Sequence, residues 1–134
     1  MKELKVATEV AAVEFERWAE LFEIDISTDG LDEEEVKAFE AFRNKFIKRV
    51  ETGAITLDDD GVISFTPRGD DGDALKFDEP TGSLLSARLK NDSDVQAARR
   101  VLAAWSGAAP KRFADMKLRD FNFCSELLAF FGNS

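Results

Sequence analysis

The period of the apolar residues changes inside one central stretch of the sequence, Ala74-Leu75-Lys76-Phe77-Asp78-Glu79-Pro80-Thr81-Gly82-Ser83-Leu84-Leu85. Before Pro80, Leu75 and Phe77 alternate with polar or small residues, which predicts a β-strand with one apolar face. After Gly82, the helical spacing continues through Leu84, Leu85, Arg88 and Leu89, and Pro80 fixes a φ angle that suits the start of a helix. The stretch therefore predicts a corner at which a strand leads into a helix.

Two further strands are predicted upstream of this corner. The β-branched runs at 55–57 and 62–66 flank an acidic segment, 58–61, that ends in glycine and is typical of a hairpin turn. A polar loop over 68–73 then leads to the strand at 75–77. We expect these three segments to form a small antiparallel sheet.

Helices are predicted before the sheet. A helical period starts at Thr8, whose hydroxyl is expected to cap the first helix. A second helix is expected from Asp32, because the spacing of Asp32 and Glu35 fits a capping box. Gly53 is expected to end that helix in a left-handed conformation.

After the corner, helical periods predict one helix that stops at Gly107 and a last one over about 118–131. The predicted fold class is α+β, a helix-rich single domain with a small antiparallel sheet of about three strands. Its expected parts are N-terminal helices over 1–52, the sheet over 53–79 and C-terminal helices over 80–134. We expect the helices to cover one face of the sheet.

Composition limits the classes of function. The 134 residues include 27 acidic and 18 basic ones, and the formal net charge of -9 repels nucleic acid phosphates and anionic lipids at long range. We therefore expect neither nucleic acid nor membrane as a partner. The chain has no histidine, the commonest general base and zinc ligand. We expect no enzyme activity, no catalytic residue, no metal and no cofactor.

The single cysteine, Cys124, cannot form an internal disulfide, and no apolar run reaches the length of a signal-peptide core or a membrane span. This predicts a reducing, cytoplasmic setting. Cys124 lies among apolar residues, so we interpret it as a buried small side chain. The aspartate clusters at 58–60 and 70–73 lack the spacing of an EF-hand loop, and we interpret them as turns.

The first and last predicted helices are apolar over a wider arc than one buried face requires. Such a helix either packs on several sides within its own domain or is covered by another chain, and the pattern leaves both open. The large side chains that a partner could meet on these two helices are Phe15, Trp18, Phe22, Phe123, Leu127 and Phe130.

Three short motifs give the chain a resemblance to a known family. They are Glu-Thr-Gly-Ala-Ile-Thr-Leu-Asp-Asp-Asp-Gly at 51–61, Leu-Lys-Phe-Asp-Glu-Pro-Thr-Gly at 75–82, and an ending built on Trp105-Ser106-Gly107, Met116 to Asp120 and an apolar last helix. With these motifs the chain resembles the tail assembly chaperones of long-tailed bacteriophages and prophages, which are grouped with the E-type chaperones of contractile-tailed phages. The strand followed by Glu-Pro-Thr-Gly is the most specific part.

The resemblance implies a non-enzymatic protein that binds the tape measure protein and helps to recruit tail tube protein around it. It implies a location in the host cytoplasm and absence from the mature virion. Apolar helices of the chain would cover apolar helices of the partner, while negative charge keeps the complex soluble. The six large side chains named above become the candidate partner-binding residues, and a homo-oligomer stays open.

Members of this family are often made in two lengths by a ribosomal frameshift near the end of the short form. Phe130-Phe131-Gly132 would be encoded by TTT TTT GGN if both phenylalanines use that codon, and a ribosome can slip on this run. Phenylalanine pairs also occur for ordinary packing reasons, so the gene sequence decides this hypothesis.

Two other functions are compatible with an acidic chain that is not an enzyme. A small inhibitor that mimics nucleic acid would display carboxylates along one face, whereas here 18 Lys and Arg residues are interspersed. A structural tail or neck component would stay in the particle and would be found in purified virions.

Overall fold

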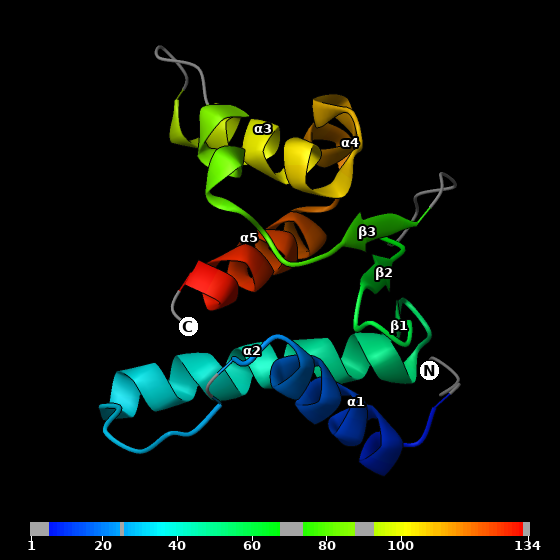
Figure 1. Cartoon of the computed structure of the whole chain (residues 1–134), viewed down its shortest axis with the longest axis vertical. Helices are drawn as coiled ribbons and strands as arrows, with labels where there is room; N and C mark the ends of the chain where they lie inside the picture. Colours follow the sequence, from blue (N-terminus) through cyan, green and yellow to red (C-terminus); the bar gives the residue numbers. More distant parts are fainter. Residues whose placement is uncertain (1–5, 25, 68–73, 88–92, 133–134) are drawn as a thin grey trace.

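The fold consists of two N-terminal helices, a small sheet and a second group of helices (Figure 1). The computed structural model describes residues 6–24, 26–67, 74–87 and 93–132, and the side chains of 85–87 and 130–132 lie outside this description. The first two helices are α1 (Thr8–Leu21) and α2 (Glu33–Glu51), which cross at one end of the molecule.

The ends of α2 follow local sequence signals. Asp32 is the N-cap residue, and its carboxylate accepts a hydrogen bond from the Glu35 amide at 2.8 Å. Gly53 follows the helix with a φ of 80°, a conformation that glycine adopts without steric cost. The start of α2 at Asp32 and the left-handed Gly53 are confirmed, whereas of the predicted capping box the structure shows only the half in which Asp32 accepts from the Glu35 amide. The predicted cap at Thr8 is wrong, because Thr8 is already the first helical residue of α1 and the N-cap position is occupied by Ala7, whose side chain caps nothing.

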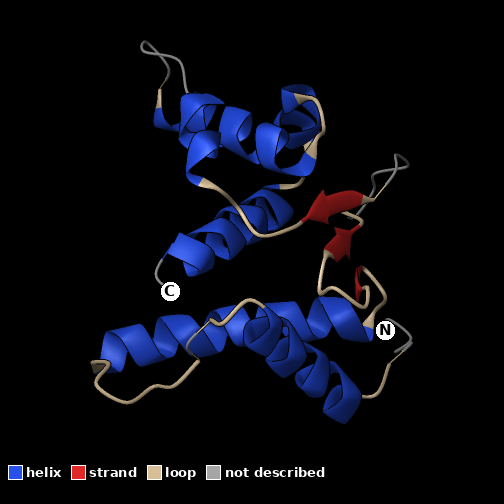
Figure 2. Cartoon of the chain, in the orientation of Figure 1, coloured by secondary structure: helices blue, strands red, loops and turns tan. Residues whose placement is uncertain are grey.

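The three predicted strands form one antiparallel sheet in the order β1 (Ile55–Leu57), β2 (Ile63–Phe65) and β3 (Leu75–Phe77) (Figure 2). The pairing register places the three central residues of the strands side by side on one face, where none is buried: Thr56, Ser64 and Lys76. The residues at the strand ends point to the other face, and five of these are buried: Ile55, Ile63, Phe65, Leu75 and Phe77. The period of two thus turns one apolar face toward the helices, as predicted.

Three helices complete the chain, namely α3 (Asp94–Ser106), α4 (Pro110–Asp115) and α5 (Leu118–Gly132). Ser93 and Gln96 form a capping box at the start of α3. Gly107 ends α3 with a φ of 76°, as predicted. In Figure 1, α5 lies between the α1–α2 pair and the group formed by α3 and α4.

The central corner forms, but the helix after it is the short 3-10 helix η1 (Gly82–Ala87) and not an α-helix. The predicted continuation of this helix through Arg88 and Leu89 lies outside the described residues. A hydrogen bond joins the corner to α3: the indole Nε1 of Trp105 donates to the Asp78 carbonyl at 2.7 Å. The Trp105 ring also packs on Phe77, with centroids 4.5 Å apart.

A cluster of aromatic rings joins these elements into one core. The ring centroids of Phe15 and Trp18 on α1 lie 5.1 Å and 5.2 Å from that of Phe46 on α2. On the other side of the core, Phe123 of α5 lies 5.6 Å from Phe65 of β2. Buried aromatic pairs stabilise a fold by about 0.5–1.5 kcal/mol each beyond the area they bury. The fold is therefore helix-rich α+β, which confirms the predicted class.

Candidate protein-interaction face

The six predicted partner-binding residues lie in different environments in the structure. Four of them have 0% of their surface exposed: Phe15, Trp18, Phe123 and Leu127. Phe22, just after α1, is half-buried against the core. The side chain of Phe130 lies outside the described residues. The four buried side chains belong to the core of this chain, so a partner could contact them only if the domain opened.

The wide apolar arc of α1 is divided between an inner and an outer face. The aromatic stripe points inward to α2, whereas Val10, Val13 and Leu21 are 52%, 58% and 45% exposed. We call these three residues the α1 outer face. The sequence pointed to the aromatic half because aromatic side chains dominate interface energies. The sequence feature that distinguishes the outer face from the aromatic inner face is the row of glutamates beside the valines, since charged residues mark the solvent side of a helix.

Acidic residues border the α1 outer face. Glu9, Glu16 and Glu20 are exposed, and their helical spacing aligns them along the side of α1 next to Val13. The helix contains four glutamates and a single basic residue, Arg17. This negative border favours a partner with Lys or Arg beside its own apolar stripe, and it disfavours pairing with the same helix of a second copy.

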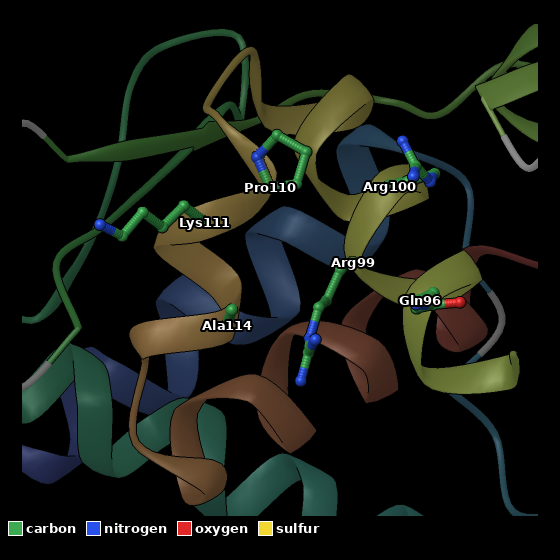
Figure 3. Close-up of a pocket in the computed structure, with 6 residues that line it drawn as sticks. All are labelled: Gln96, Arg99, Arg100, Pro110, Lys111 and Ala114. Atoms are coloured by element: carbon green, nitrogen blue, oxygen red, sulfur yellow. The ribbon is translucent and has the colours of Figure 1, made fainter. Parts of the chain in front are cut away.

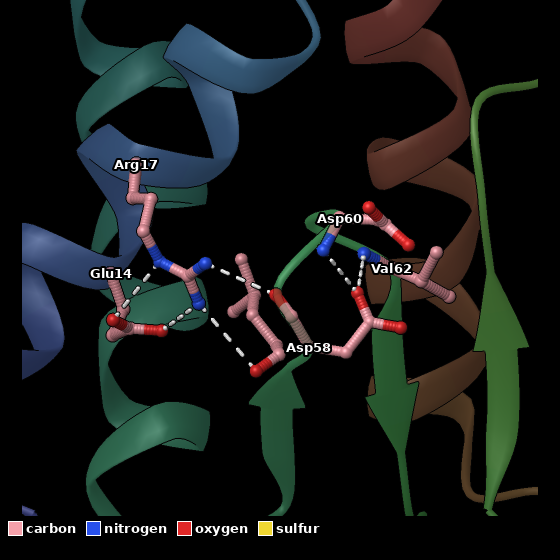
Figure 4. A network of polar contacts seen from close by, with 6 residues as sticks. Glu14, Arg17, Asp58, Asp60 and Val62 are labelled. Atoms are coloured by element: carbon pink, nitrogen blue, oxygen red, sulfur yellow. Dashed lines mark hydrogen bonds and ion pairs between the residues drawn. The ribbon is translucent and has the colours of Figure 1, made fainter.

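Arg17 also lies on this side of α1, but its guanidinium is bound to neighbouring groups (Figure 4). Nη1 donates to the Asp58 carbonyl at 3.0 Å, and Nη2 donates to a Glu14 carboxylate oxygen at 2.8 Å. The hydrogen bond with Glu14 raises the pKa of Arg17 although burial opposes the shift, so the guanidinium stays charged. Arg17 thus attaches α1 to the hairpin between β1 and β2, and Glu14 offsets its charge.

The hairpin supports the C-terminal end of the α1 outer face. The Asp58 carboxylate accepts hydrogen bonds from the amides of Asp60 and Val62, both at 2.9 Å, and so closes the turn. Next in the turn, Gly61 has a φ of 85°, and a Cβ atom at this position would lie 2.9 Å from Leu21 Cδ1. The hairpin backbone therefore contacts Leu21 directly. Within the described residues, the aspartate cluster at 58–60 provides a turn; the cluster at 70–73 lies outside them.

Other exposed apolar residues of the described chain lie singly. Leu31 precedes α2, Val95 is in the first turn of α3, and Leu118 begins α5, with exposed fractions of 37%, 52% and 72%. Single exposed apolar residues are ordinary on protein surfaces, whereas several on one helix face indicate an interaction site. We therefore regard the α1 outer face as the candidate functional site.

Metal binding and thiol chemistry can be judged for the described part of the chain. Among its residues, no three His, Cys, Asp or Glu side chains lie close enough together to hold a metal ion. Cys124 is fully buried, and burial raises the pKa of its thiol to about 12, so the thiol is protonated at neutral pH and unsuited to act as a nucleophile. The helices within the described ranges are all too short or too polar to cross a bilayer.

Comparison with known proteins gives no relative for this chain: no family model, no curated protein and no solved structure matches it. The function must therefore be inferred from the exposure, contacts and charge of the residues themselves.

Proposed function

We propose that this chain is a phage or prophage tail assembly chaperone, a non-enzymatic protein that binds tape measure protein and assists the assembly of the tail tube. The sequence resemblance at 51–61, at 75–82 and in the C-terminal helix supports the family. A binding function is supported by the α1 outer face, where three apolar side chains are exposed to solvent beside exposed glutamates. On this proposal the protein acts in the host cytoplasm and is absent from the mature virion.

The α1 outer face suits one kind of partner, an amphipathic helix with a basic border. Val10, Val13 and Leu21 lie along one side of α1, so the apolar stripe of a second helix can pack along them. Lys or Arg residues on that helix would lie near Glu9 and Glu16. The remaining negative charge of the chain, with a formal total of -9, keeps such a complex soluble.

Co-expression with the tape measure protein of the same phage tests the proposal. The wild-type chain should keep the tape measure protein soluble and be recovered with it through an affinity tag. The double variant Val10→Ser/Val13→Ser should lose most of this capture, because it replaces the centre of the α1 outer face with hydroxyls. Both valines are more than half exposed, so the variant should fold as the wild type does.

Leu118→Ser is the matched control, since it also exchanges an exposed apolar side chain for a hydroxyl but lies on α5. It should capture the tape measure protein as well as the wild type. Equal capture by the valine double variant would exclude the α1 outer face as the site. A wild-type chain that neither binds nor solubilises the tape measure protein would contradict the function itself.

The proposed location has a test of its own. Mass spectrometry of purified virions and of the lysate should detect the chain in the lysate and not in the particles. A stoichiometric amount in the particles would instead favour a structural tail or neck component.

A further inference from the structure

The dipeptide Asp-Gly occurs in two turns of the described chain. Asp29-Gly30 belongs to the connection between α1 and α2, which loops outward at one edge of the molecule (Figure 1). Asp60-Gly61 belongs to the hairpin between β1 and β2, and a further copy, Asp71-Gly72, lies outside the described residues. Asp-Gly is the dipeptide at which an aspartate rearranges most easily to isoaspartate, because glycine places no side chain beside its amide nitrogen. The structure shows which of the two turns permits this rearrangement.

The rearrangement requires an amide nitrogen that is free to react. The glycine nitrogen attacks the side-chain carboxyl carbon of the aspartate: a C–N bond forms, the C–O bond to the hydroxyl breaks, and the hydroxyl leaves as water with the amide proton. Water then opens the succinimide ring, and attack at the backbone carbonyl leaves the chain running through the side-chain carbonyl, which is isoaspartate. The water lost in the first step is regained in the second, so no oxidant, reductant or cofactor takes part.

The Gly30 amide meets this requirement. Residues 28–31 form a β-turn that is closed by a hydrogen bond of 3.2 Å from the Leu31 amide to the Thr28 carbonyl. Gly30 is the third residue of this turn, with a φ of 82°, and among the described residues nothing accepts a hydrogen bond from its amide. Asp29 and Gly30 are exposed, and a Cβ atom at Gly30 would meet nothing within 4 Å beyond its chain neighbours. The surroundings therefore leave room for the succinimide ring.

The Gly61 amide is held by the hairpin instead. It closes the turn itself, donating to the Asp58 carbonyl at 3.1 Å. The Asp58 carboxylate accepts hydrogen bonds from the amides on both sides of this glycine, those of Asp60 and Val62, at 2.9 Å each (Figure 4). Gly61 is also buried, against Leu21 of α1. Ring closure at Asp60 would require this nitrogen to leave its hydrogen bond and the packed turn to open.

We propose that Asp29 is a site of isoaspartate formation in the folded protein, and that the hairpin protects Asp60 from the same reaction. The product keeps the negative charge and lengthens the backbone between α1 and α2 by one carbon. Its new α-carboxylate lies in an exposed turn, which makes it a substrate for a carboxyl methyltransferase that uses a sulfonium methyl donor. The proposal does not rest on the proposed function, because neither the α1 outer face nor tape measure protein takes part.

Labelling of the full chain in heavy-oxygen water tests the proposal. Each passage through the succinimide introduces one oxygen from water, so a chain kept for weeks at neutral pH gains one heavy oxygen at every site that has reacted. Trypsin separates the two sites, since Asp29 lies on the peptide 18–37 and Asp60 on the peptide 50–68. Mass spectrometry should find the label at Asp29 and about tenfold less or lower at Asp60, where a hydrogen bond must break first. An isoaspartyl methyltransferase should methylate only the peptide 18–37.

Unfolding and two variants supply the controls. In guanidinium chloride both turns are lost, so the two peptides should gain label at similar rates. Asp29→Glu should remove the label from the peptide 18–37, because the longer side chain closes a six-membered ring far more slowly; the residue is exposed, so this variant should fold as the wild type does. Asp58→Ala should raise the labelling of Asp60 severalfold, since it removes the carboxylate that fixes the amides on both sides of Gly61.

Three outcomes would overturn the proposal, and the first two need only the wild-type chain. If the folded chain gained no label at Asp29, the turn at 28–31 would not permit ring closure. If Asp29 and Asp60 gained label equally in the folded chain, the hydrogen bond of the Gly61 amide would give no protection. If the peptide 18–37 of Asp29→Glu were labelled like that of the wild type, another residue would be the site.

Discussion

The Arg49 guanidinium of α2 and the Asp120 carboxylate of α5 form an ion pair, with Nη2 3.2 Å from Oδ1, inside the contact between the two helices. The two side chains are only 13% and 3% exposed. The guanidinium carbon also lies 4.3 Å from the centroid of the Phe123 ring, so one face of the cation is covered by an aromatic side chain. Residues 71 positions apart in the sequence are thus joined by a pair that water scarcely reaches.

Asp120→Asn should strongly destabilise the domain. The substitution keeps the shape of the side chain but leaves the Arg49 charge without its buried counter-charge, and breaking such a pair costs about 3–5 kcal/mol. Urea unfolding followed by the fluorescence of the two tryptophans measures the free energy of unfolding.

Glu126→Gln is the control for this prediction. It breaks the other α2–α5 ion pair, Lys45–Glu126, which has a shorter N–O distance of 2.8 Å but side chains 41% and 37% exposed. Because exposed pairs contribute about 0–1 kcal/mol, this variant should unfold almost as the wild type does. Equal losses in the two variants would mean that burial does not set the strength of the Arg49–Asp120 pair.

Phe123→Ala should also destabilise the domain severely. Phe123 is fully buried, stacks on Phe42 with centroids 5.7 Å apart, and contacts Phe65 and the Arg49 guanidinium. Large-to-alanine changes of this kind cost about 3–5 kcal/mol through lost burial and the cavity left behind. Thermal unfolding by circular dichroism measures the effect.

Leu118→Ala supplies the comparison on the same helix. Leu118 is 72% exposed, so the melting temperature should hardly change. If Phe123→Ala instead folded like the wild type and lost only partner binding, Phe123 would be a contact residue and the core described above would be incorrect.

The local parts of the fold could be predicted from the sequence because each depends on neighbouring residues. Three strands, the Asp32 cap and the end of α3 at Gly107 follow from alternation, capping chemistry and the conformational freedom of glycine. The 3-10 helix η1 was predicted as an ordinary helix, since apolar spacing at 84–85 does not distinguish three from 3.6 residues per turn over so short a segment.

The candidate sites could be predicted only in part, because they depend on contacts between distant segments. On α1 both stripes are apolar, and the stripe of Phe15 and Trp18 points inward only because Phe46 on α2 packs against it. In the same way, the pocket between α3 and α4 is lined by Arg99 and Lys111, which are on different helices joined by a turn (Figure 3). No periodicity in the sequence brings these side chains together.

Gly61→Ala should destabilise the domain more than Gly30→Ala does. Both glycines have a left-handed backbone, with φ values of 85° and 82°, and an alanine in this conformation costs about 1–2 kcal/mol. At Gly61 the new Cβ would also lie 2.9 Å from Leu21 Cδ1, whereas at Gly30 it would meet nothing within 4 Å. The additional loss at Gly61, about 1 kcal/mol or more for overpacking, can be measured by urea unfolding. Equal losses would show that the hairpin does not press on α1.

Cys124 should make the stability of the domain fall at alkaline pH. Burial raises the pKa of its thiol from 9.0 to about 12, so between these values the folded chain holds a proton that the unfolded chain has released. Its contribution is fully present below about pH 9 and is lost as the pH rises toward 12, by about 1.4 kcal/mol per pH unit. Urea unfolding at a series of pH values should show a steeper alkaline decline for the wild type than for Cys124→Ala, in which every other titrating group is kept.

Alkylation by iodoacetamide provides a second readout for the same thiol. At pH 8 the folded chain should react far more slowly than the chain in concentrated urea, because Cys124 is fully buried and its thiolate is scarce. Asp120→Asn should speed the labelling, since a less stable domain opens more often and exposes the thiol. If the folded wild type were labelled as fast as the unfolded chain, or if Cys124→Ala declined with pH as steeply as the wild type, the thiol would be accessible to solvent and α5 would not pack as described.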